Sequence, residues 1–252
     1  MKLFAAKKRQ KRRAEERIMY TINSGGDFHF SEAYKTLRTN LNFMSVNSEY
    51  KKILVTSSVP REGKSNVCIN LAISLAQSGK KVLLVECDLR KPVMHKYLIM
   101  GSRYKGTGGK RAKGLTEVLS GACTYEEVIN DLAEDNLYAM FAGAIPPNPA
   151  ELLGSKKMKD LVETLEQSFD YIIFDTPPTL VVTDACVLSK ITDGVLFVVS
   201  QNQVKIEESK AAVNNLRSVN ANIIGAVLNN FKPEKTHKDS NYYYYNYKYE
   251  YK

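Results

Sequence analysis

Short apolar segments alternate with helix-like segments along most of the chain, and this alternation is the strongest constraint on its fold. The apolar segments are rich in Ile, Leu and Val, as is typical of strands buried on both faces. Such strands, separated by helices, predict a parallel sheet covered on both sides. We therefore expect an α/β fold with a mostly parallel central sheet and helices on both faces. The predicted strands are residues 52–56, 81–86, 137–141, 171–174, 194–199 and 222–228.

The segments between the strands predict helices. Ser31 is expected to cap the first of them, and Gly79 to end the second. A chain of 252 residues is long enough for one domain with a sizeable core. We expect that domain to span residues 31–231, between a basic segment (1–30) and a disordered terminal segment (232–252). The predicted helices are residues 31–45, 62–78, 115–119, 125–130, 155–167, 183–190 and 206–217, with a turn at 145–149.

The net charge of +9 is unevenly distributed. Residues 1–17 carry eight Lys or Arg against two Glu, a pattern that suits anionic lipid or nucleic acid. No base-reading helix or stacking aromatic set accompanies it, so we expect no nucleic-acid partner. A second basic stretch, residues 101–114, is interpreted as a solvated loop. With no long apolar run and no signal peptide, we expect a cytoplasmic location.

A phosphate-binding loop is predicted where the first strand runs into the second helix. Residues 57–65 read SSVPREGKS, and strand, loop and helix follow in the required order. Lys64 is expected to reach the β- and γ-phosphates, and the Ser65 hydroxyl to bind Mg²⁺. Ser58 stands where the usual pattern has its first glycine. The predicted nucleotide-binding residues of this region are Pro60, Arg61, Glu62, Gly63, Lys64, Ser65 and Asn66.

Acidic residues follow two other predicted strands. Glu86 and Asp88 stand two residues apart, so both should point to one side, as a pair that faces a metal. Asp175 follows the apolar run at 171–174. Since Mg²⁺ takes one or two carboxylates together with phosphate oxygens and water, the sequence predicts an ATP–Mg²⁺ site. Its predicted metal ligands are Ser65, Asp88 and Asp175.

These motifs resemble those of the bacterial protein-tyrosine kinases of capsule and exopolysaccharide biosynthesis. VPREGKS, ECDLRKP and FDTPP stand in the family's order, and GAIPPNPAELL at 143–153 also belongs to its pattern. The resemblance covers residues 31–231 and the terminal tyrosines. It implies the P-loop fold of the deviant-Walker ATPases, like that of the Min and Par proteins, with ATP/ADP and Mg²⁺ as cofactors. It further implies that Asn229 contacts adenine.

The final eleven residues, 242–252, hold seven tyrosines, which no packed core requires. Exposed phenols in such number suggest a substrate for phosphate transfer, and the resemblance implies that a neighbouring subunit phosphorylates them. A sticky low-complexity segment without a role is the alternative. The predicted phosphoacceptors are Tyr242, Tyr243, Tyr244, Tyr245, Tyr247, Tyr249 and Tyr251.

The chain departs from the family's pattern at three positions. Arg61 replaces a glycine, Glu86 replaces the first aspartate of D-x-D, and Lys35 replaces an arginine in E-x-x-R-x-x-R. In relatives this last motif joins subunits into a ring, so Glu32, Lys35 and Arg38 are the predicted oligomer interface. A solvated helix face is the alternative.

The predicted reaction transfers phosphate from ATP to tyrosine, with Lys64, Glu86, Asp88 and Asp175 as catalytic residues. Glu86 or Asp88 is expected to accept the phenol proton. The resemblance implies an octamer-like ring, a membrane-embedded activator of the polysaccharide co-polymerase type that recruits the kinase to the inner face of the plasma membrane, and a tyrosine phosphatase. Two alternatives stay open: a Par- or Min-like positioning ATPase, and a non-catalytic nucleotide-binding scaffold.

Overall fold

A computed structural model describes residues 28–44, 49–98, 113–132 and 134–231. The basic stretch at 1–17, all but the last two residues of the stretch at 101–114, and the tyrosine cluster lie outside the described residues. Among the helices of the described part, none is long and apolar enough to cross a lipid bilayer.

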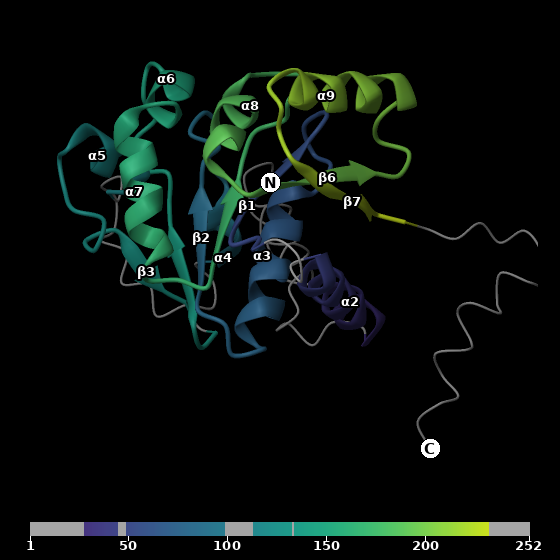
Figure 1. Cartoon of the computed structure of the whole chain (residues 1–252), viewed down its shortest axis with the longest axis horizontal. Coiled ribbons are helices and arrows are strands. Elements are labelled where there is room, and N and C mark those ends of the chain that lie inside the picture. Colours follow the sequence, from purple (N-terminus) through teal and green to yellow (C-terminus); the bar gives the residue numbers. More distant parts are fainter. Residues whose placement is uncertain (1–27, 45–48, 99–112, 133, 232–252) are drawn as a thin grey trace, which may run out of the picture.

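A seven-stranded sheet forms the centre of the molecule, with strand order β3-β4-β2-β5-β1-β6-β7 (Figure 1). All neighbouring pairs are parallel except β3 with β4. The predicted mostly parallel sheet is thereby confirmed. The strands are β1 (Lys52–Ser57), β2 (Val82–Glu86), β3 (Ile129–Asp131), β4 (Leu137–Met140), β5 (Tyr171–Asp175), β6 (Gly194–Ser200) and β7 (Ile223–Asn229).

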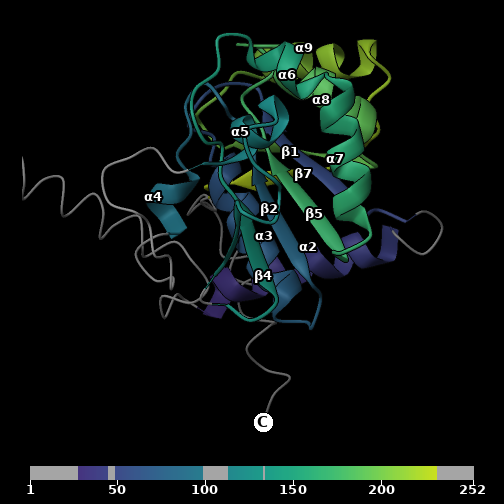
Figure 2. The ribbon, with the colours of Figure 1, turned by 90° about the vertical axis from the view of Figure 1, so that its left-hand side faces the viewer.

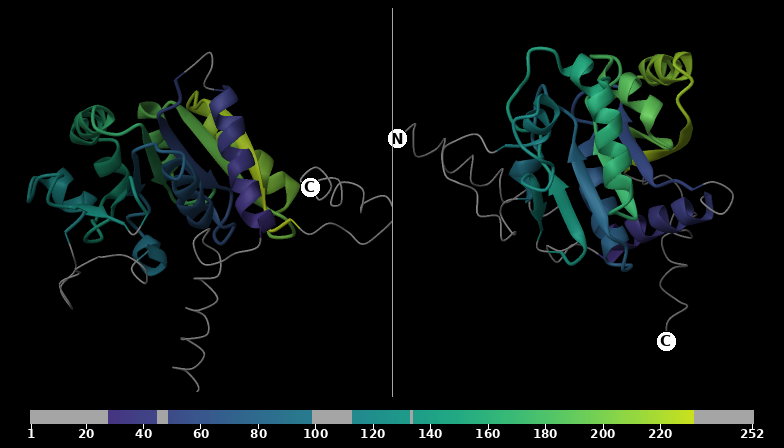
Figure 3. Two further views of the ribbon diagram at one scale, coloured as in Figure 1. Left: turned by 90° about the horizontal axis from the view of Figure 1, so that it is seen from below. Right: turned by 60° about the vertical axis from the view of Figure 1, so that its left-hand side comes forward.

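Helices cover both faces of the sheet (Figure 2), and each layer closes its own apolar core. One core joins the sheet to α5 (Leu115–Ser120), α6 (Pro149–Leu153), α7 (Lys156–Glu166), α8 (Asp184–Leu188) and α9 (Ile206–Ser218). The other joins it to α2 (Phe28–Met44), α3 (Lys64–Ala76) and α4 (Met94–Leu98). A 3₁₀ turn, η2 (Ser189–Ile191), follows α8. Figure 3 shows α2 running beside β7 at one edge of the sheet.

The register of the three central strands positions the functional edge. β5 lies between β1 and β2, with Asp175 level with Val55 on one side and Glu86 on the other. Because all three strands run in one direction, their carboxyl ends open onto the same edge. The loops that carry the predicted motifs therefore meet there.

Three helix predictions were wrong, in whole or in part. The first helix begins at Phe28 rather than at a Ser31 cap, because Phe30 packs against Tyr34 one turn later, with ring centroids 5.1 Å apart. Residues 125–130 form a turn and the start of β3, since Ile129 pairs with Met140 on the edge strand β4. The predicted helix at 62–78 begins at Lys64, because the two residues before it belong to the phosphate loop.

We expect Phe174→Ala to lower the free energy of unfolding by about 3–5 kcal/mol, because it removes a fully buried aromatic ring from the central strand. Phe43→Ala is the matched control, since that ring is 72% exposed on α2 and its loss should change stability by less than about 0.5 kcal/mol. Urea unfolding of both variants gives the comparison. Similar losses in the two would contradict the assigned packing.

Candidate functional site

The phosphate loop has the backbone of a closed anion-binding turn. It leaves β1 at Ser57 and enters α3 at Lys64, with Gly63 as the N-cap at φ 88°. A Cβ at Gly63 would lie 2.0 Å from the side-chain nitrogen of Asn229, so both the conformation and the space require glycine here. The first backbone N–H groups of α3 face the loop, as phosphate binding at a helix N-terminus requires.

Two strand ends hold this loop in place. The Glu62 carboxylate is fully buried and accepts hydrogen bonds from the backbone nitrogens of Val59 (2.7 Å) and Ser200 (3.2 Å). The Asn229 side chain donates to the Glu62 carbonyl oxygen at 2.8 Å. The loop is therefore fixed to the ends of β6 and β7. Glu62, predicted to bind nucleotide, points its side chain inward and serves as an anchor.

Arg61 is exposed and adopts φ 73°, in the left-handed region. That conformation costs a residue with a Cβ roughly 1–2 kcal/mol relative to glycine. This cost explains why glycine is usual at this position in the family that the sequence resembles. Arginine is compatible with the loop because its side chain extends into solvent.

Lys64, Asp88 and Asp175 converge at the edge where β1, β2 and β5 end. The Lys64 ammonium lies 3.9 Å from an oxygen of Asp88, and both side chains are largely buried. The other Asp88 oxygen accepts a hydrogen bond from the Lys91 backbone nitrogen at 3.0 Å. One cation and two carboxylates from three separate elements thus share one site, as the sequence predicted.

Asp175 is fully buried, and no hydrogen bond of normal geometry from the described residues reaches either of its carboxylate oxygens. Burial raises the pKa of Asp175 to about 6, while Lys64 and the nearby Ser65 hydroxyl act in the opposite direction. A buried carboxylate without partners is the kind of group that a cation satisfies. Among the described residues no three His, Cys, Asp or Glu side chains form a metal site by themselves. The residues present therefore fit Mg²⁺ that arrives with phosphate oxygens, held through Ser65, Asp175 and Asp88.

The position of Glu86 does not match the predicted metal-facing pair. One of its oxygens accepts hydrogen bonds from the backbone nitrogens of Val93 and Met94, and the other from Ala142 at 3.2 Å. Burial raises the pKa of Glu86 above its ordinary value, although these backbone donors act in the opposite direction. Glu86 thus ties the end of β2 to the start of α4 and to Ala142, two residues after β4. Its two-residue spacing from Asp88 gave no sign of this, because the chain turns immediately after the strand.

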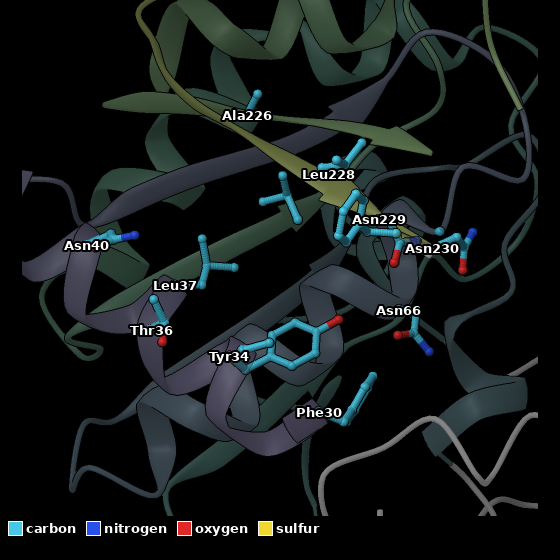
Figure 4. Close-up of a pocket in the computed structure, with 14 residues that line it drawn as sticks. Phe30, Tyr34, Thr36, Leu37, Asn40, Asn66, Ala226, Leu228, Asn229 and Asn230 are labelled. Carbon is cyan, nitrogen blue, oxygen red and sulfur yellow. The ribbon is translucent and has the colours of Figure 1, made fainter. Parts of the chain in front are cut away.

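A cavity of about 630 Å³ opens beside the phosphate loop, between α2 and β7. In Figure 4, Asn66, Asn229 and Asn230 gather at one end, and Tyr34 and Leu37 of α2 line the wall near Leu228. Asn229, predicted from the resemblance, therefore lies where the loop meets this cavity. The α2 side of the wall was not predicted, since no periodicity in residues 28–40 indicates that it faces the last strand.

The three predicted interface residues lie on α2. Glu32 and Lys35 form an exposed ion pair at 2.7 Å, which matches the solvated-face alternative for this isolated chain. Arg38 donates to the Ser74 carbonyl oxygen at the end of α3. The structure thus engages Arg38 within its own chain, and the interface role of all three residues stays a prediction.

Residues 50–228 match the family model described as an AAA domain. The chain is 40% identical over 215 residues to the tyrosine-protein kinase YwqD of Bacillus subtilis, covering 85% of this chain and 86% of that protein. It is 33% identical to the putative tyrosine-protein kinase CapB of Staphylococcus aureus, at 85% and 89% coverage. The chain belongs to the bacterial tyrosine-protein kinases.

Solved structures agree with this tyrosine-protein kinase assignment. The chimerical protein CapA2B2 superposes with a TM-score of 0.77 at 31% identity, over 86% of this kinase and 91% of that chain. The kinase domain of Escherichia coli ETK gives 0.72 at 30% identity, over 82% and 79%. The cell division ATPase MinD of Pyrococcus furiosus gives 0.56 at 25% identity, over 70% and 71%. The kinase shares the P-loop ATPase fold with MinD and resembles the tyrosine kinases more closely.

We expect Arg61→Gly to stabilise this kinase by about 1 kcal/mol, because glycine adopts φ 73° without strain. The greater conformational entropy of glycine in the unfolded chain offsets only part of this stabilisation. Arg61→Ala keeps the strained conformation and should show no gain. Urea unfolding of the two variants separates the effects of backbone and side chain. If alanine stabilised as much as glycine, the backbone explanation would be wrong.

Asp175→Asn should stabilise the nucleotide-free kinase at pH 8, by at most about 3 kcal/mol, since one pKa unit corresponds to about 1.4 kcal/mol. The folded pKa of about 6 lies above the ordinary 3.8, so the wild type loses stability as the pH rises from about 4 to about 6. The advantage of the variant is therefore about halved at pH 5. Urea unfolding in EDTA measures it, with the exposed Asp131→Asn as control. A pH-independent effect would contradict the burial argument.

Proposed function

We propose that this chain is an ATP-dependent protein-tyrosine autokinase that phosphorylates its own C-terminal tyrosine cluster and regulates capsular or exopolysaccharide synthesis and export. The observation that carries the proposal is the convergence of Lys64, Asp88 and Asp175 at the phosphate loop. It occurs in a chain 40% identical to a tyrosine-protein kinase over most of both lengths. The proposed acceptors, Tyr242 to Tyr245, Tyr247, Tyr249 and Tyr251, lie outside the described residues.

In the proposed reaction a tyrosine oxygen attacks the γ-phosphorus of ATP, and the bond from that phosphorus to the β–γ bridging oxygen breaks. The Lys64 ammonium attracts the phosphate oxygens while negative charge shifts toward ADP. Mg²⁺, when bound, neutralises further charge on these oxygens. The phenol proton goes to a carboxylate, and Asp88 is the better acceptor, because the oxygens of Glu86 are engaged by three backbone N–H groups.

The cavity beside the loop is proposed to take the base of ATP at its asparagine end. Amide side chains carry both a donor and an acceptor, as an adenine edge requires. The Asn229 amide nitrogen already holds the Glu62 carbonyl, so base binding and loop position depend on the same side chain.

Transfer between subunits is the second part of the proposal. An octamer-like ring, joined through Glu32, Lys35 and Arg38, would bring the terminal segment of one subunit to the site of the next. A membrane-embedded activator of the polysaccharide co-polymerase type, which the family resemblance implies, would recruit the kinase to the inner face of the plasma membrane. A tyrosine phosphatase would reverse the modification.

Both alternatives have a distinct outcome. A Par- or Min-like positioning ATPase would consume ATP without modifying itself, and such proteins typically carry a second lysine where this chain has Ser58 and Val59. A non-catalytic scaffold would bind ATP and consume none. The closer likeness to tyrosine kinases than to MinD favours the kinase.

We expect incubation of the full chain with ATP and Mg²⁺ to add mass in steps of one phosphate, mapped to Tyr242–Tyr251 by fragmentation. Lys64→Met should abolish the gain in mass, since it removes the cation that lies beside Asp88 and that would bind the phosphates. Lys80→Met, at an exposed position after α3, is the matched control and should behave as wild type. Loss of ATP without a gain in protein mass would favour the positioning ATPase. If no ATP were lost, even with an activator fragment present, the scaffold would be favoured.

A further inference from the structure

We infer that Arg90 is a positioning residue that, through Asp184, fixes the loop carrying Asp88 against the segment that follows Asp175. The inference rests on the proposed function, since it concerns how the same site holds a nucleotide with its Mg²⁺. Arg90 has no part in the mechanism described above. It stands in the ECDLRKP motif without a predicted role, and Asp184 was not singled out.

The contact between the two side chains is a planar fork. Arg90 Nε donates to Asp184 Oδ2 at 2.9 Å, and Nη2 donates to Oδ1 at 3.0 Å. Both carboxylate oxygens are therefore engaged by one guanidinium, in the geometry that gives Arg–carboxylate pairs their directional specificity. A lysine would supply the charge without the fork.

The burial of the pair is asymmetric. The Asp184 side chain is fully buried at the start of α8, whereas 39% of the Arg90 side chain is exposed. A carboxylate removed from water is strongly unfavourable unless it is paired. Asp184 is therefore a fixed point in the structure, and the arginine reaches in from the surface to meet it.

The position of the pair links it to the site. Arg90 stands two residues after Asp88, and Asp184 nine residues after Asp175. Backbone pairing of the two strands continues to Cys87, whose nitrogen donates to the Asp175 carbonyl at 2.8 Å. Beyond Cys87 the loop turns away, and its local bonds, Lys91 to Asp88 and Val93 to Glu86, lie within the loop and its own strand. The Arg90 fork connects this loop to the first residue of α8, which follows the Asp175 segment in the chain.

This arrangement makes a specific prediction about Asp88. Its oxygen lies 3.9 Å from the Lys64 ammonium, so a small movement of the loop changes the distance between the carboxylate and the metal–phosphate position. Mutation of a residue that holds a metal ligand in its orientation typically lowers metal affinity by about 10–100-fold. Loss of the fork should therefore weaken the part of nucleotide binding that depends on Mg²⁺ and leave the metal-independent part nearly unchanged.

The test measures binding of a fluorescent ATP analogue to the full chain in Mg²⁺ and in EDTA. For Arg90→Lys we expect the Mg²⁺-dependent gain in affinity to fall about tenfold or more, affinity in EDTA to stay within about twofold, and the melting temperature to remain close to wild type. Arg217→Lys, an exposed arginine on α9, is the matched control and should change nothing.

A second pair of variants separates positioning from stability. Arg90→Ala leaves Asp184 buried and unpaired and should lower the melting temperature. Arg90→Ala combined with Asp184→Asn removes the buried charge and should restore much of that loss without restoring the Mg²⁺-dependent gain. If the double variant recovered both, or Arg90→Lys kept the full gain, a purely structural role would replace this inference. If the wild type itself showed no Mg²⁺-dependent gain, the proposed function would fail together with it.

Discussion

The pairing of β5 between β1 and β2 is the constraint on which the site depends. It sets Asp175 level with Val55 and Glu86, and the chain can then deliver a lysine, two aspartates and a helix N-terminus to one edge. A slip of one residue in this register would turn Asp175 away from Lys64 and bring an apolar side chain into its place. The burial of Phe174 in the core below holds the register.

Function and stability conflict at this edge. Asp175 is buried with no hydrogen-bond partner in the part of the chain that the structure describes, and Arg61 is held at a positive φ in the loop. Both features lower the stability of the fold. Glu62 and Glu86 have the opposite character, because their buried carboxylates are satisfied by backbone N–H groups. Glu62 thus anchors the phosphate loop and Glu86 the end of β2, while Asp175 is left for a cation to satisfy.

The sequence predicted the sheet and the convergence of Lys64 with Asp88 because both follow from local pattern. Apolar runs mark strands, and a parallel sheet gathers their ends without knowledge of any side-chain contact. Contacts made after the chain turns were not predictable in this way. Glu86 stands only two residues from Asp88, yet its carboxylate accepts from backbone nitrogens of two other segments. Arg90 finds a partner 94 residues away. Such pairs depend on loop shape, which no periodicity records.

The anchoring of the phosphate loop also orders events during synthesis. The loop leaves the ribosome early, but the Glu62 side chain finds its second partner only at Ser200, 138 residues later. The Asn229 amide that holds the Glu62 carbonyl comes 167 residues later. A nascent chain therefore lacks both distant anchors of this loop through most of translation, at ordinary rates of about 5–20 residues per second. The phosphate loop closes only when the last strand joins the sheet, so tight nucleotide binding belongs to the finished domain and not to its growing fragments.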